Sequence, residues 1–245
     1  MTHQFTFKRV MVKLTGESLS KPNQKGIDFD VVDAVAQGLL EMKKRTQHQM
    51  AIVIGGGNIY RGREAALQVD KATADYVGML ATIMNGLALE ESINRLAESR
   101  KSVLMTSVQM NAIAEPFYRK KALARLEKDR IVILAGGTGS PFFTTDSAAA
   151  LRAAELNCDV VLKGSTTDGV YTSDPHKDPQ AKRYQYLNYQ TALEKHLEVM
   201  DSNAFAICQN ENIPILVFRA EDLGKVLGGG KMGTMVGDVQ DEFYE

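Results

Sequence analysis

Two lysines interrupt apolar segments at points where a buried positive charge needs an anion nearby. Lys13 lies near the end of the run 9–14, and Lys163 closes the run 159–163 directly before Gly164. Both runs predict strands buried on both faces, and ligands of open α/β sheets bind at the carboxyl ends of such strands. Lys13 and Lys163 therefore predict phosphate contacts, with a side chain that reaches the surface as the alternative for Lys13.

A glycine-rich segment follows another apolar run, 131–135, and precedes the alanine-rich run 147–154. The segment 136–146 has three glycines in four positions, then two threonines and an aspartate where a helix would begin. Glycines let a backbone approach a ligand closely, and the N–H groups at a helix start bind anions. This segment therefore predicts a site for a phosphorylated substrate. The alternative is an ordinary strand–helix connection with a threonine cap.

A second glycine turn ends the apolar run 50–54. It consists of residues 55–58 (GGGN), and Arg61 lies just beyond it. The planar guanidinium group of arginine suits the geometry of phosphate oxygens. The carboxylates that could serve the same site are Asp146, Asp174 and Asp201.

This combination of groups suits phosphoryl transfer, which needs positioned positive charge and in-line alignment, with Mg²⁺ bridging the phosphates of the donor. The P-loop pattern G-x-x-x-x-G-K-[ST] is absent from the sequence. A G-x-G-x-x-G run occurs at 228–233, but it follows a predicted helix and precedes a predicted strand, so we interpret it as a turn. No serine–histidine or cysteine–histidine pairing stands out, which disfavours covalent catalysis.

Apolar periodicity predicts the elements that would position these residues. Strands are expected over 9–14, 50–54, 102–105, 131–135, 159–164 and 213–218, and near 234–236. Helices are expected over 30–46, 75–99, 115–128, 147–154, 189–197, 202–210 and 221–227. Strands and helices alternate, which is typical of an α/β fold with a mostly parallel central sheet and helices on both faces.

The composition is that of an ordinary globular protein. The chain has 245 residues, 44% hydrophobic and 24% charged, with a formal net charge of -1. This balance does not favour nucleic acid or an anionic membrane as a partner. Cys158 and Cys208 have neither a disulfide nor a metal-ligand spacing. The N-terminus lacks a signal-peptide pattern and no apolar run has the length of a membrane span, so we expect a cytoplasmic enzyme.

Several motifs resemble the amino acid kinase superfamily. They are residues 13–17 (KLTGE), 55–58 (GGGN), 139–146 (GSPFFTTD) and 168–175 (DGVYTSDP). Within that superfamily, three further segments are similar to the bacterial UMP kinase family, namely 61–62 (RG), 78–82 (GMLAT) and 84–88 (MNGLA). The resemblance extends over about 8–236, and the run 141–146 (PFFTTD) is its most specific part.

The resemblance implies a three-layer α/β sandwich formed by a single domain, 1–245. Its acceptor-binding half would cover roughly 1–155 and its ATP-binding half roughly 156–245. The implied activity is transfer of the γ-phosphoryl group of ATP to UMP, giving UDP and ADP in pyrimidine nucleotide biosynthesis. Mg²⁺ would enter with ATP and be held mainly by the nucleotide phosphates, with no metal site built from protein ligands.

The same resemblance implies roles for individual residues. Lys13 and Lys163 would neutralise the phosphoryl group during transfer. Asp201 would orient a lysine, and Asp146 would assist at the catalytic centre or the metal. The residues implied for UMP binding are Gly56, Asp75, Thr138, Gly139, Ser140, Pro141, Phe142, Phe143, Thr144 and Thr145. The residues implied for ATP binding are Lys13, Leu14, Thr15, Gly16, Gly57, Arg61, Ser165, Tyr171 and Asp174.

The resemblance also implies a homo-oligomer, since the family typically forms homohexamers, and many members are activated by GTP and inhibited by UTP. The loop 20–26 is not the glycine-rich version expected of a GTP-responsive region. Two alternatives stay open: another kinase of the superfamily that acts on a carboxylate or carbamate, and a nucleotide sensor without turnover. The run 141–145 argues against the first, and the presence of both Lys13 and Lys163 argues against the second.

Overall fold

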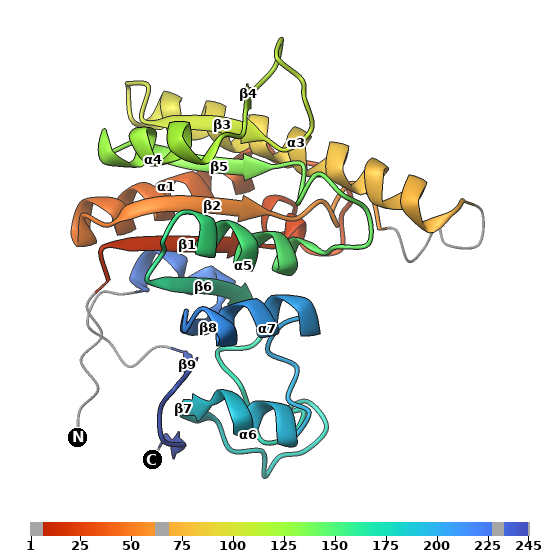
Figure 1. The fold of residues 1–245 in the computed structure, drawn as a ribbon, viewed down its shortest axis with the longest axis vertical. Coiled ribbons are helices and arrows are strands. Elements are labelled where there is room, and N and C mark those ends of the chain that lie inside the picture. Colours follow the sequence, from red (N-terminus) through yellow and green to blue (C-terminus); the bar gives the residue numbers. More distant parts are fainter. Residues whose placement is uncertain (1–6, 62–68, 227–232, 245) are drawn as a thin grey trace.

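The computed structural model of the protein describes residues 7–61, 69–226 and 233–244. Its centre is a sheet of ten strands in the order β10-β7-β9-β8-β6-β1-β2-β5-β3-β4 (Figure 1). The strands are β1 (Arg9–Leu14), β2 (Gln49–Ile54), β3 (Ser102–Thr106), β4 (Glu115–Pro116), β5 (Ile131–Ala135), β6 (Val160–Ser165), β7 (Tyr184–Asn188), β8 (Ile215–Arg219), β9 (Thr234–Gly237) and β10 (Glu242–Phe243).

Most neighbouring strands of this sheet run parallel. Within the described ranges seven strand pairs are parallel. Two pairs, β8–β9 and β7–β10, are antiparallel. The central strands β1, β2 and β5 are buried along almost their whole length, as their continuous apolar runs predict. The predicted α/β class with a mostly parallel sheet is therefore confirmed.

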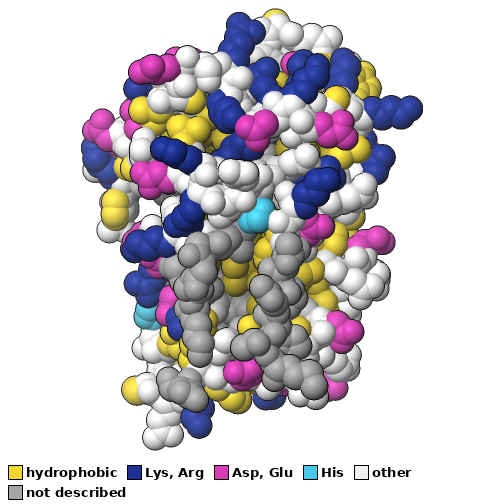
Figure 2. All heavy atoms as spheres, turned by 90° about the vertical axis from the view of Figure 1, so that its left-hand side faces the viewer, with side chains coloured by type: hydrophobic (Ala, Val, Ile, Leu, Met, Phe, Trp, Pro, Cys, Tyr) yellow, Lys and Arg dark blue, Asp and Glu magenta, His cyan; other side chains and the backbone are white. Residues whose placement is uncertain are grey.

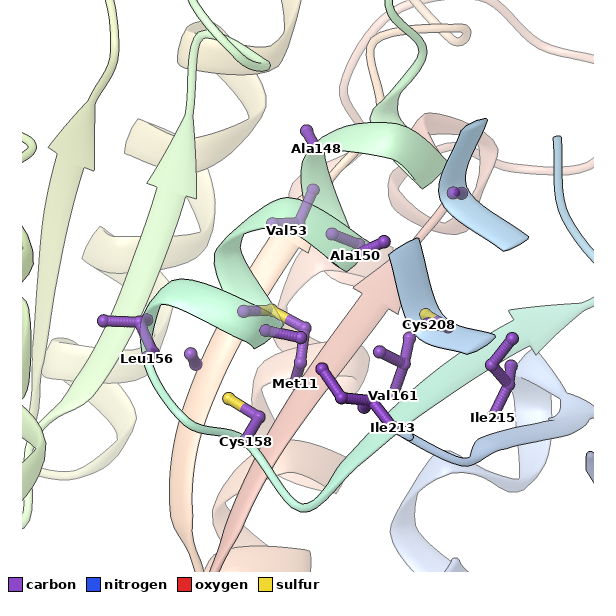
Figure 3. Close-up of a cluster of buried hydrophobic side chains, with 14 of the residues drawn as sticks. Met11, Val53, Ala148, Ala150, Leu156, Cys158, Val161, Cys208, Ile213 and Ile215 are labelled. Atoms are coloured by element: carbon purple, nitrogen blue, oxygen red, sulfur yellow. The ribbon is translucent and has the colours of Figure 1, made fainter. Parts of the chain in front are cut away.

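Helices cover both faces of the sheet (Figure 1). They are α1 (Phe29–Thr46), α3 (Lys71–Leu96), α4 (Arg119–Glu127), α5 (Thr145–Glu155), α6 (Tyr189–Glu194) and α7 (Ser202–Asn210), with two 3₁₀ turns, η1 (Gly16–Leu19) and η2 (Ala220–Lys225). Successive side chains of a strand point to opposite faces. Met11 accordingly joins the apolar cluster beneath α5 and α7 (Figure 3), and Val10 and Val12 join the cluster beneath α1 and α3.

Aspartate caps explain where the two longest helices begin. The Asp28 side chain accepts hydrogen bonds from the backbone N–H groups of Asp30 and Val31, so α1 starts at Phe29. The Asp70 side chain accepts from the N–H of Thr73, so α3 starts at Lys71. The predicted start at residue 75 was therefore one turn too late.

Two predicted helices differ from the structure. The segment predicted as a helix over 115–128 is a short strand, β4, followed by α4 at Arg119–Glu127. Pro116 disfavours a helical conformation at Glu115, which instead pairs with Met105 of β3. The segment predicted as a helix over 221–227 is the 3₁₀ turn η2 as far as residue 225, and residue 227 lies outside the described residues.

Strands β7 and β10 were not predicted. The sequence of β7 (YQYLN) mixes polar and aromatic residues, so it lacks the apolar run that identified the central strands. Both strands lie at one edge of the sheet, where burial is incomplete and the pattern is weak. The glycine run 228–233, interpreted as a turn, lies outside the described residues except for Gly233.

The end of the sheet where β1 and β2 begin carries charges of both signs. Figure 2 shows lysine and arginine side chains gathered over the upper part of this end, with acidic side chains among them. The lysines predicted to bind phosphate lie at the opposite, carboxyl end of the strands. No helix within the described residues is both long enough and apolar enough to cross a membrane.

Candidate active site

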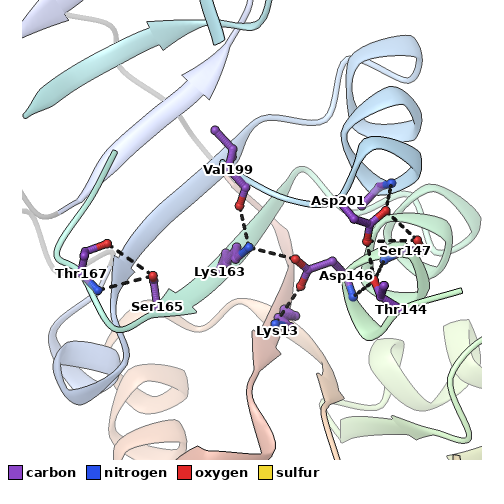
Figure 4. Close-up of polar contacts among 10 residues, drawn as sticks. Lys13, Thr144, Asp146, Ser147, Lys163, Ser165, Thr167, Val199 and Asp201 are labelled. Carbon is purple, nitrogen blue, oxygen red and sulfur yellow. Dashed lines mark hydrogen bonds and ion pairs between the residues drawn. The ribbon is translucent and has the colours of Figure 1, made fainter. Parts of the chain in front are cut away.

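Lys13 and Lys163 lie side by side on β1 and β6. They are register partners on these parallel strands, so their side chains point to the same face of the sheet. Asp146, in the first turn of α5, lies between them (Figure 4). Its Oδ1 is 2.7 Å from Lys13 Nζ and its Oδ2 is 2.9 Å from Lys163 Nζ. Lys163 Nζ also donates a hydrogen bond of 2.6 Å to the carbonyl of Val199. We call Lys13, Asp146 and Lys163 the charge cluster.

The charge cluster is largely shielded from water. Its side chains are 8% (Lys13), 14% (Asp146) and 16% (Lys163) exposed. Burial alone would raise the pKa of Asp146, but the charges and hydrogen bonds of both lysines outweigh it and hold this pKa below its ordinary value. Two ammonium groups and one carboxylate give a formal net charge of +1. This excess positive charge would stabilise an anionic phosphoryl group placed against it.

The backbone conformation of the segment 136–139 requires its glycines. Gly136, Gly137 and Gly139 have positive φ angles of 78°, 58° and 85°, which other residues rarely adopt. A Cβ on Gly136 would also lie 2.8 Å from Thr106 Oγ1. The close approach to a ligand that we expected is therefore not needed to explain these glycines, and they are no independent evidence for a ligand.

Threonine capping at the start of α5 matches the predicted strand–turn–helix arrangement. The side chain of Thr144 accepts hydrogen bonds from the N–H groups of Asp146 and Ser147, at 3.0 and 3.2 Å. Because this cap fixes the first turn of α5, it also fixes the position of the Asp146 carboxylate. The capping residue thus contributes to the charge cluster without touching a lysine.

The loop before α5 is held in an uncommon conformation. Phe142 has a φ of 73°, which is rare for a bulky side chain. Its N–H donates a hydrogen bond of 2.7 Å to Oδ2 of Asp75, and Lys71 Nζ lies 5.5 Å from the centre of its ring. Backbone strain held by surrounding contacts is typical of functional loops.

A pocket of about 160 Å³ opens between this loop and α3, and we call it the acceptor pocket. Six residues implied for UMP binding line it: Gly56, Asp75, Thr138, Phe143, Thr144 and Thr145. Four others, Gly139, Ser140, Pro141 and Phe142, are not part of its lining as the structure describes it. The lining also includes residues that were not predicted, among them Tyr60, Met79 and Thr82. Met79 and Thr82 belong to the family-like segment 78–82, which carried no ligand role in the sequence analysis, and they reach the pocket on α3. Tyr60 follows the second glycine turn and lies in none of the recognised motifs.

A second pocket of about 470 Å³ lies on the other side of Lys163, and we call it the donor pocket. Three residues implied for ATP binding, Ser165, Tyr171 and Asp174, line it together with Lys163. Its far wall comes from the connection 195–199, which was not predicted to take part. Val199 acts there through its backbone carbonyl, for which sequence offers no signal.

The end of β1 is closely packed against the second glycine turn. The side chain of Leu14 is buried, and Thr15 Oγ1 is 3.1 Å from Ser18 Oγ. A Cβ on Gly16 would lie 2.6 Å from the backbone nitrogen of Gly57. Leu14, Thr15 and Gly16 are therefore placed beside the charge cluster but not on the described lining of the donor pocket.

Arg61 lies apart from the donor pocket. Its Nη2 is 2.8 Å from Oε1 of Glu17, and it lines a separate pocket of about 330 Å³ together with Gly57 and the loop 20–25. The structure therefore does not bring Arg61 and Gly57 together with Ser165, Tyr171 and Asp174.

Asp201 contacts hydroxyl groups instead of a lysine in the described part of the chain. Its carboxylate accepts hydrogen bonds from Thr144 Oγ1 and, at 2.9 Å, from Ser147 Oγ (Figure 4). It also caps α7 by accepting from the N–H of Ala204 at 3.0 Å. The carboxylate that contacts both lysines is Asp146. The lysine-orienting role of Asp201 stays a prediction.

The chain is an α/β protein with a mostly parallel sheet that carries a lysine pair and a helix-borne carboxylate at its carboxyl edge, an arrangement that suits phosphoryl transfer. The model of the amino acid kinase family matches residues 8–219. The chain therefore belongs to the amino acid kinase family.

Solved UMP kinases are similar to the chain over almost its whole length. The UMP kinase from Bacillus anthracis is 34% identical, with 98% of this chain and 99% of that chain covered and a TM-score of 0.92. The UMP kinase from Ureaplasma parvum is 35% identical, with 96% and 100% covered and a TM-score of 0.88. The uridylate kinase from Archaeoglobus fulgidus is 26% identical, with 93% and 99% covered and a TM-score of 0.69. The resemblance to bacterial UMP kinases that the motifs predicted is confirmed.

Proposed function

We propose that the protein transfers the γ-phosphoryl group of ATP to UMP, giving UDP and ADP. One observation carries this proposal: the charge cluster connects residues of the two pockets. Thr144 and Thr145 line the acceptor pocket, and Asp146 follows them directly. Lys163, which is paired with Asp146, lines the donor pocket. A phosphoryl group that crosses from one pocket to the other would pass this positive charge.

The residues of the charge cluster would act by position and charge. Lys13 and Lys163 would stabilise the negative charge spread over the phosphoryl oxygens during transfer. Asp146 would hold both ammonium groups in place, and Val199 fixes the direction of Lys163 from the other side. Because these groups are already ordered by mutual contacts, little reorganisation is needed when substrates bind.

UMP would occupy the acceptor pocket. Its phosphate would lie toward Thr144, Thr145 and the start of α5, and its remaining part would lie toward Asp75 and the loop 138–143. The carboxylate of Asp75 accepts a hydrogen bond from the N–H of Phe142, so Asp75 would shape this loop. The wider set of UMP contacts, which includes Gly139, Ser140, Pro141 and Phe142, stays a prediction of the family resemblance.

ATP would occupy the donor pocket, in the half of the chain that follows residue 155. Ser165, Tyr171 and Asp174 would contact it there. We propose Leu14, Thr15, Gly16, Gly57 and Arg61 as further contacts, on the family resemblance alone. The division into an acceptor half, roughly 1–155, and an ATP half, roughly 156–245, belongs to the same proposal.

Mg²⁺ would arrive with ATP. Among the described residues no group of three or more histidine, cysteine, aspartate or glutamate side chains is placed to hold a metal ion. Mg²⁺ in kinases is bound by substrate phosphates, waters and one or two carboxylates, so a site with few protein ligands is compatible with Mg²⁺. Asp146 is the carboxylate of the charge cluster that could assist. The bound ion would neutralise charge on the phosphate oxygens.

Association with further copies of the chain is also part of the proposal. Four apolar side chains of α3, Tyr76, Val77, Leu80 and Met84, are between 38% and 51% exposed. A helix that is apolar on all sides is usually covered on all sides. We propose a homo-oligomer that buries this face. A hexameric state, activation by GTP and inhibition by UTP rest on the family resemblance. A cytoplasmic location stays the expectation drawn from the sequence.

A substrate panel tests the function. ADP release should be measured with ATP, Mg²⁺ and, in turn, UMP, acetylglutamate, aspartate and carbamate. We expect release with UMP and none with the others. Release with a carboxylate or carbamate would instead support another kinase of the superfamily. Tight binding of UMP and ATP without UDP formation would support a nucleotide sensor.

A further inference from the structure

The last residues of the described chain pack against β7, and Tyr184 of this strand contacts Lys195 of the donor pocket. Phe243 of β10 is the register partner of Tyr184 on β7. Tyr244 continues this contact, because its N–H donates to the carbonyl of Arg183 at 3.1 Å. In Figure 1 the C-terminus accordingly lies beside β7, far along the chain from the donor-pocket residues.

One series of contacts runs from Tyr244 to the donor pocket. The guanidinium carbon of Arg183 lies 3.9 Å from the centre of the Tyr244 ring. Arg183 forms an ion pair with Asp168. Asp168 Oδ1 accepts a hydrogen bond of 2.7 Å from the hydroxyl of Tyr171, which lines the donor pocket. Each group in this series orients the next.

A second series runs from Phe243 to the same pocket. The rings of Phe243 and Tyr184 are stacked with their centres 4.4 Å apart. The Tyr184 side chain is fully buried, and its hydroxyl accepts a hydrogen bond of 2.9 Å from Lys195 Nζ. Lys195 lines the donor pocket, as Tyr171 does. The two neighbouring C-terminal residues therefore support two walls of one pocket.

The wall that these contacts support has little room to rearrange. Gly169 of the donor pocket lies between Thr234 and Arg183, and a Cβ there would be 2.6 Å from Thr234 Oγ1 and 3.0 Å from Arg183 Cδ. The hydroxyl of Tyr244 donates to the carbonyl of Gly233 at 2.7 Å, which ties the C-terminal segment to the residue that precedes β9. A shift of the C-terminal segment would therefore move Arg183 and the pocket lining with it.

We propose that residues 242–244 are a positioning element of the donor pocket, with Tyr244 and Phe243 acting through Arg183 and Tyr184 to place Tyr171 and Lys195. The inference rests on the proposed function in that the pocket binds ATP. Neither aromatic residue touches the charge cluster in the described structure. Their loss should therefore weaken nucleotide binding and leave the acceptor side unchanged.

The test compares aromatic and aliphatic residues at position 244. Tyr244→Phe keeps a ring over Arg183, whereas Tyr244→Leu and Tyr244→Ala remove it. We expect the two variants without a ring to raise the KM for ATP about threefold to tenfold, because a cation–π contact that shields an ion pair is lost. Tyr244→Phe loses the hydroxyl bond to Gly233 but keeps the ring over Arg183 and the backbone bond to its carbonyl, so its KM for ATP should stay within about twofold of the wild type. The KM for UMP should stay within about twofold in every variant.

A matched control and a coupled variant sharpen the comparison. Tyr118→Ala removes an exposed tyrosine that also has a lysine, Lys121, over its ring, and it should leave the KM for ATP unchanged. Tyr171→Phe removes only the hydroxyl that donates to Asp168. If Tyr244 acts through that hydroxyl, Tyr244→Leu should raise the KM for ATP less in the Tyr171→Phe background than in the wild type.

Binding without turnover separates this inference from the proposed function. The probe is AMP-PNP, a non-hydrolysable ATP analogue, titrated by calorimetry in the absence of UMP. Unchanged affinity in Tyr244→Leu, or equal weakening in Tyr244→Phe, would overturn the positioning role. A wild-type chain that binds AMP-PNP but makes no UDP would contradict the proposed function only. A wild-type chain that does not bind AMP-PNP would overturn both. Urea unfolding of each variant is the control that distinguishes a loss of binding from a loss of fold.

Discussion

At the scale of single residues, the account depends on one carboxylate between two lysines. Asp146 contacts Lys13 and Lys163 at hydrogen-bonding distance, and all three side chains are mostly buried. The burial of three charged groups costs folding free energy, and a cluster of this kind is best explained if it stabilises charge on a ligand. Lys163 lines the donor pocket, and Asp146 directly follows Thr144 and Thr145 of the acceptor pocket, so we propose this cluster as the centre of the reaction.

Removal of the donor-side lysine should affect turnover more than binding. We expect Lys163→Ala to lower kcat by roughly 100- to 1,000-fold, because the loss of one placed charge weakens stabilisation of the transferring group. Lys225→Ala, which removes an exposed lysine of η2, is the matched control and should keep wild-type kcat. Steady-state kinetics with UMP and ATP measure both. Near-normal kcat in Lys163→Ala would remove Lys163 from the reaction.

Asp146→Asn should lower stability in a way that depends on pH. The folded-state pKa of Asp146 lies below its ordinary value, so its stabilising contribution is present above the unfolded pKa of about 3.9 and is lost as pH falls through the folded pKa. We expect Asp146→Asn to reduce the free energy of unfolding at pH 7 by on the order of 3 kcal/mol, with a smaller difference at strongly acidic pH. Urea unfolding at several pH values measures this.

The matched control for that prediction is Glu127→Gln, which alters an exposed carboxylate at the end of α4. It should change the free energy of unfolding by less than about 0.5 kcal/mol. If the difference in the free energy of unfolding between the wild type and Asp146→Asn grew toward acidic pH, it would contradict a folded-state pKa of Asp146 below its ordinary value.

At the scale of elements, the first turns of α5 and α7 are joined by Asp201. This aspartate caps α7 and also accepts hydrogen bonds from Thr144 and Ser147 of the α5 start. Thr144 lines the acceptor pocket, so the contact connects α7 to the proposed UMP site. Sequence motifs identified Asp201 as important but not its partners, because those partners lie more than fifty positions earlier in the chain.

Asp201→Asn separates the two roles that this residue could have. Asparagine also caps helices, so α7 should remain intact. We expect the KM for UMP to rise about threefold to tenfold through weaker contacts to the hydroxyl groups, with kcat within about twofold. Asp28→Asn, a capping aspartate of α1 on the opposite face, is the control. A large fall in kcat with unchanged KM would instead support the lysine-orienting role implied by the resemblance.

The elements of the sheet centre could be predicted, and those of its edge could not. Strands β1, β2 and β5 are continuous apolar runs because both faces are buried, and such runs are easy to recognise. Strand β7 has only two buried residues among half-buried ones, and β10 has only two residues. Within the candidate site, Lys13 and Lys163 could be predicted because they lie at the ends of apolar runs. The carbonyl of Val199 and the side chain of Lys195 could not, because only tertiary contacts bring them to the site.

At the scale of the whole molecule, the exposed apolar face of α3 should mediate association. We expect Leu80→Glu to weaken self-association at least about tenfold, since a charge would be buried in the contact. Phe29→Glu places the same charge on another exposed apolar residue, at the start of α1, and should have no such effect. Analytical ultracentrifugation measures the mass of each. A wild-type chain that is monomeric at micromolar concentration would contradict the proposed oligomer.

The central claim is that the charge cluster transfers phosphoryl from ATP to UMP. The most direct measurement follows the label from [γ-³²P]ATP in a mixture with UMP and Mg²⁺, for the wild type and for Lys163→Ala. The account predicts that label appears in UDP with the wild type and that its rate of appearance falls roughly 100-fold or more in the variant. Label released only as inorganic phosphate, or equal rates in both proteins, would contradict it.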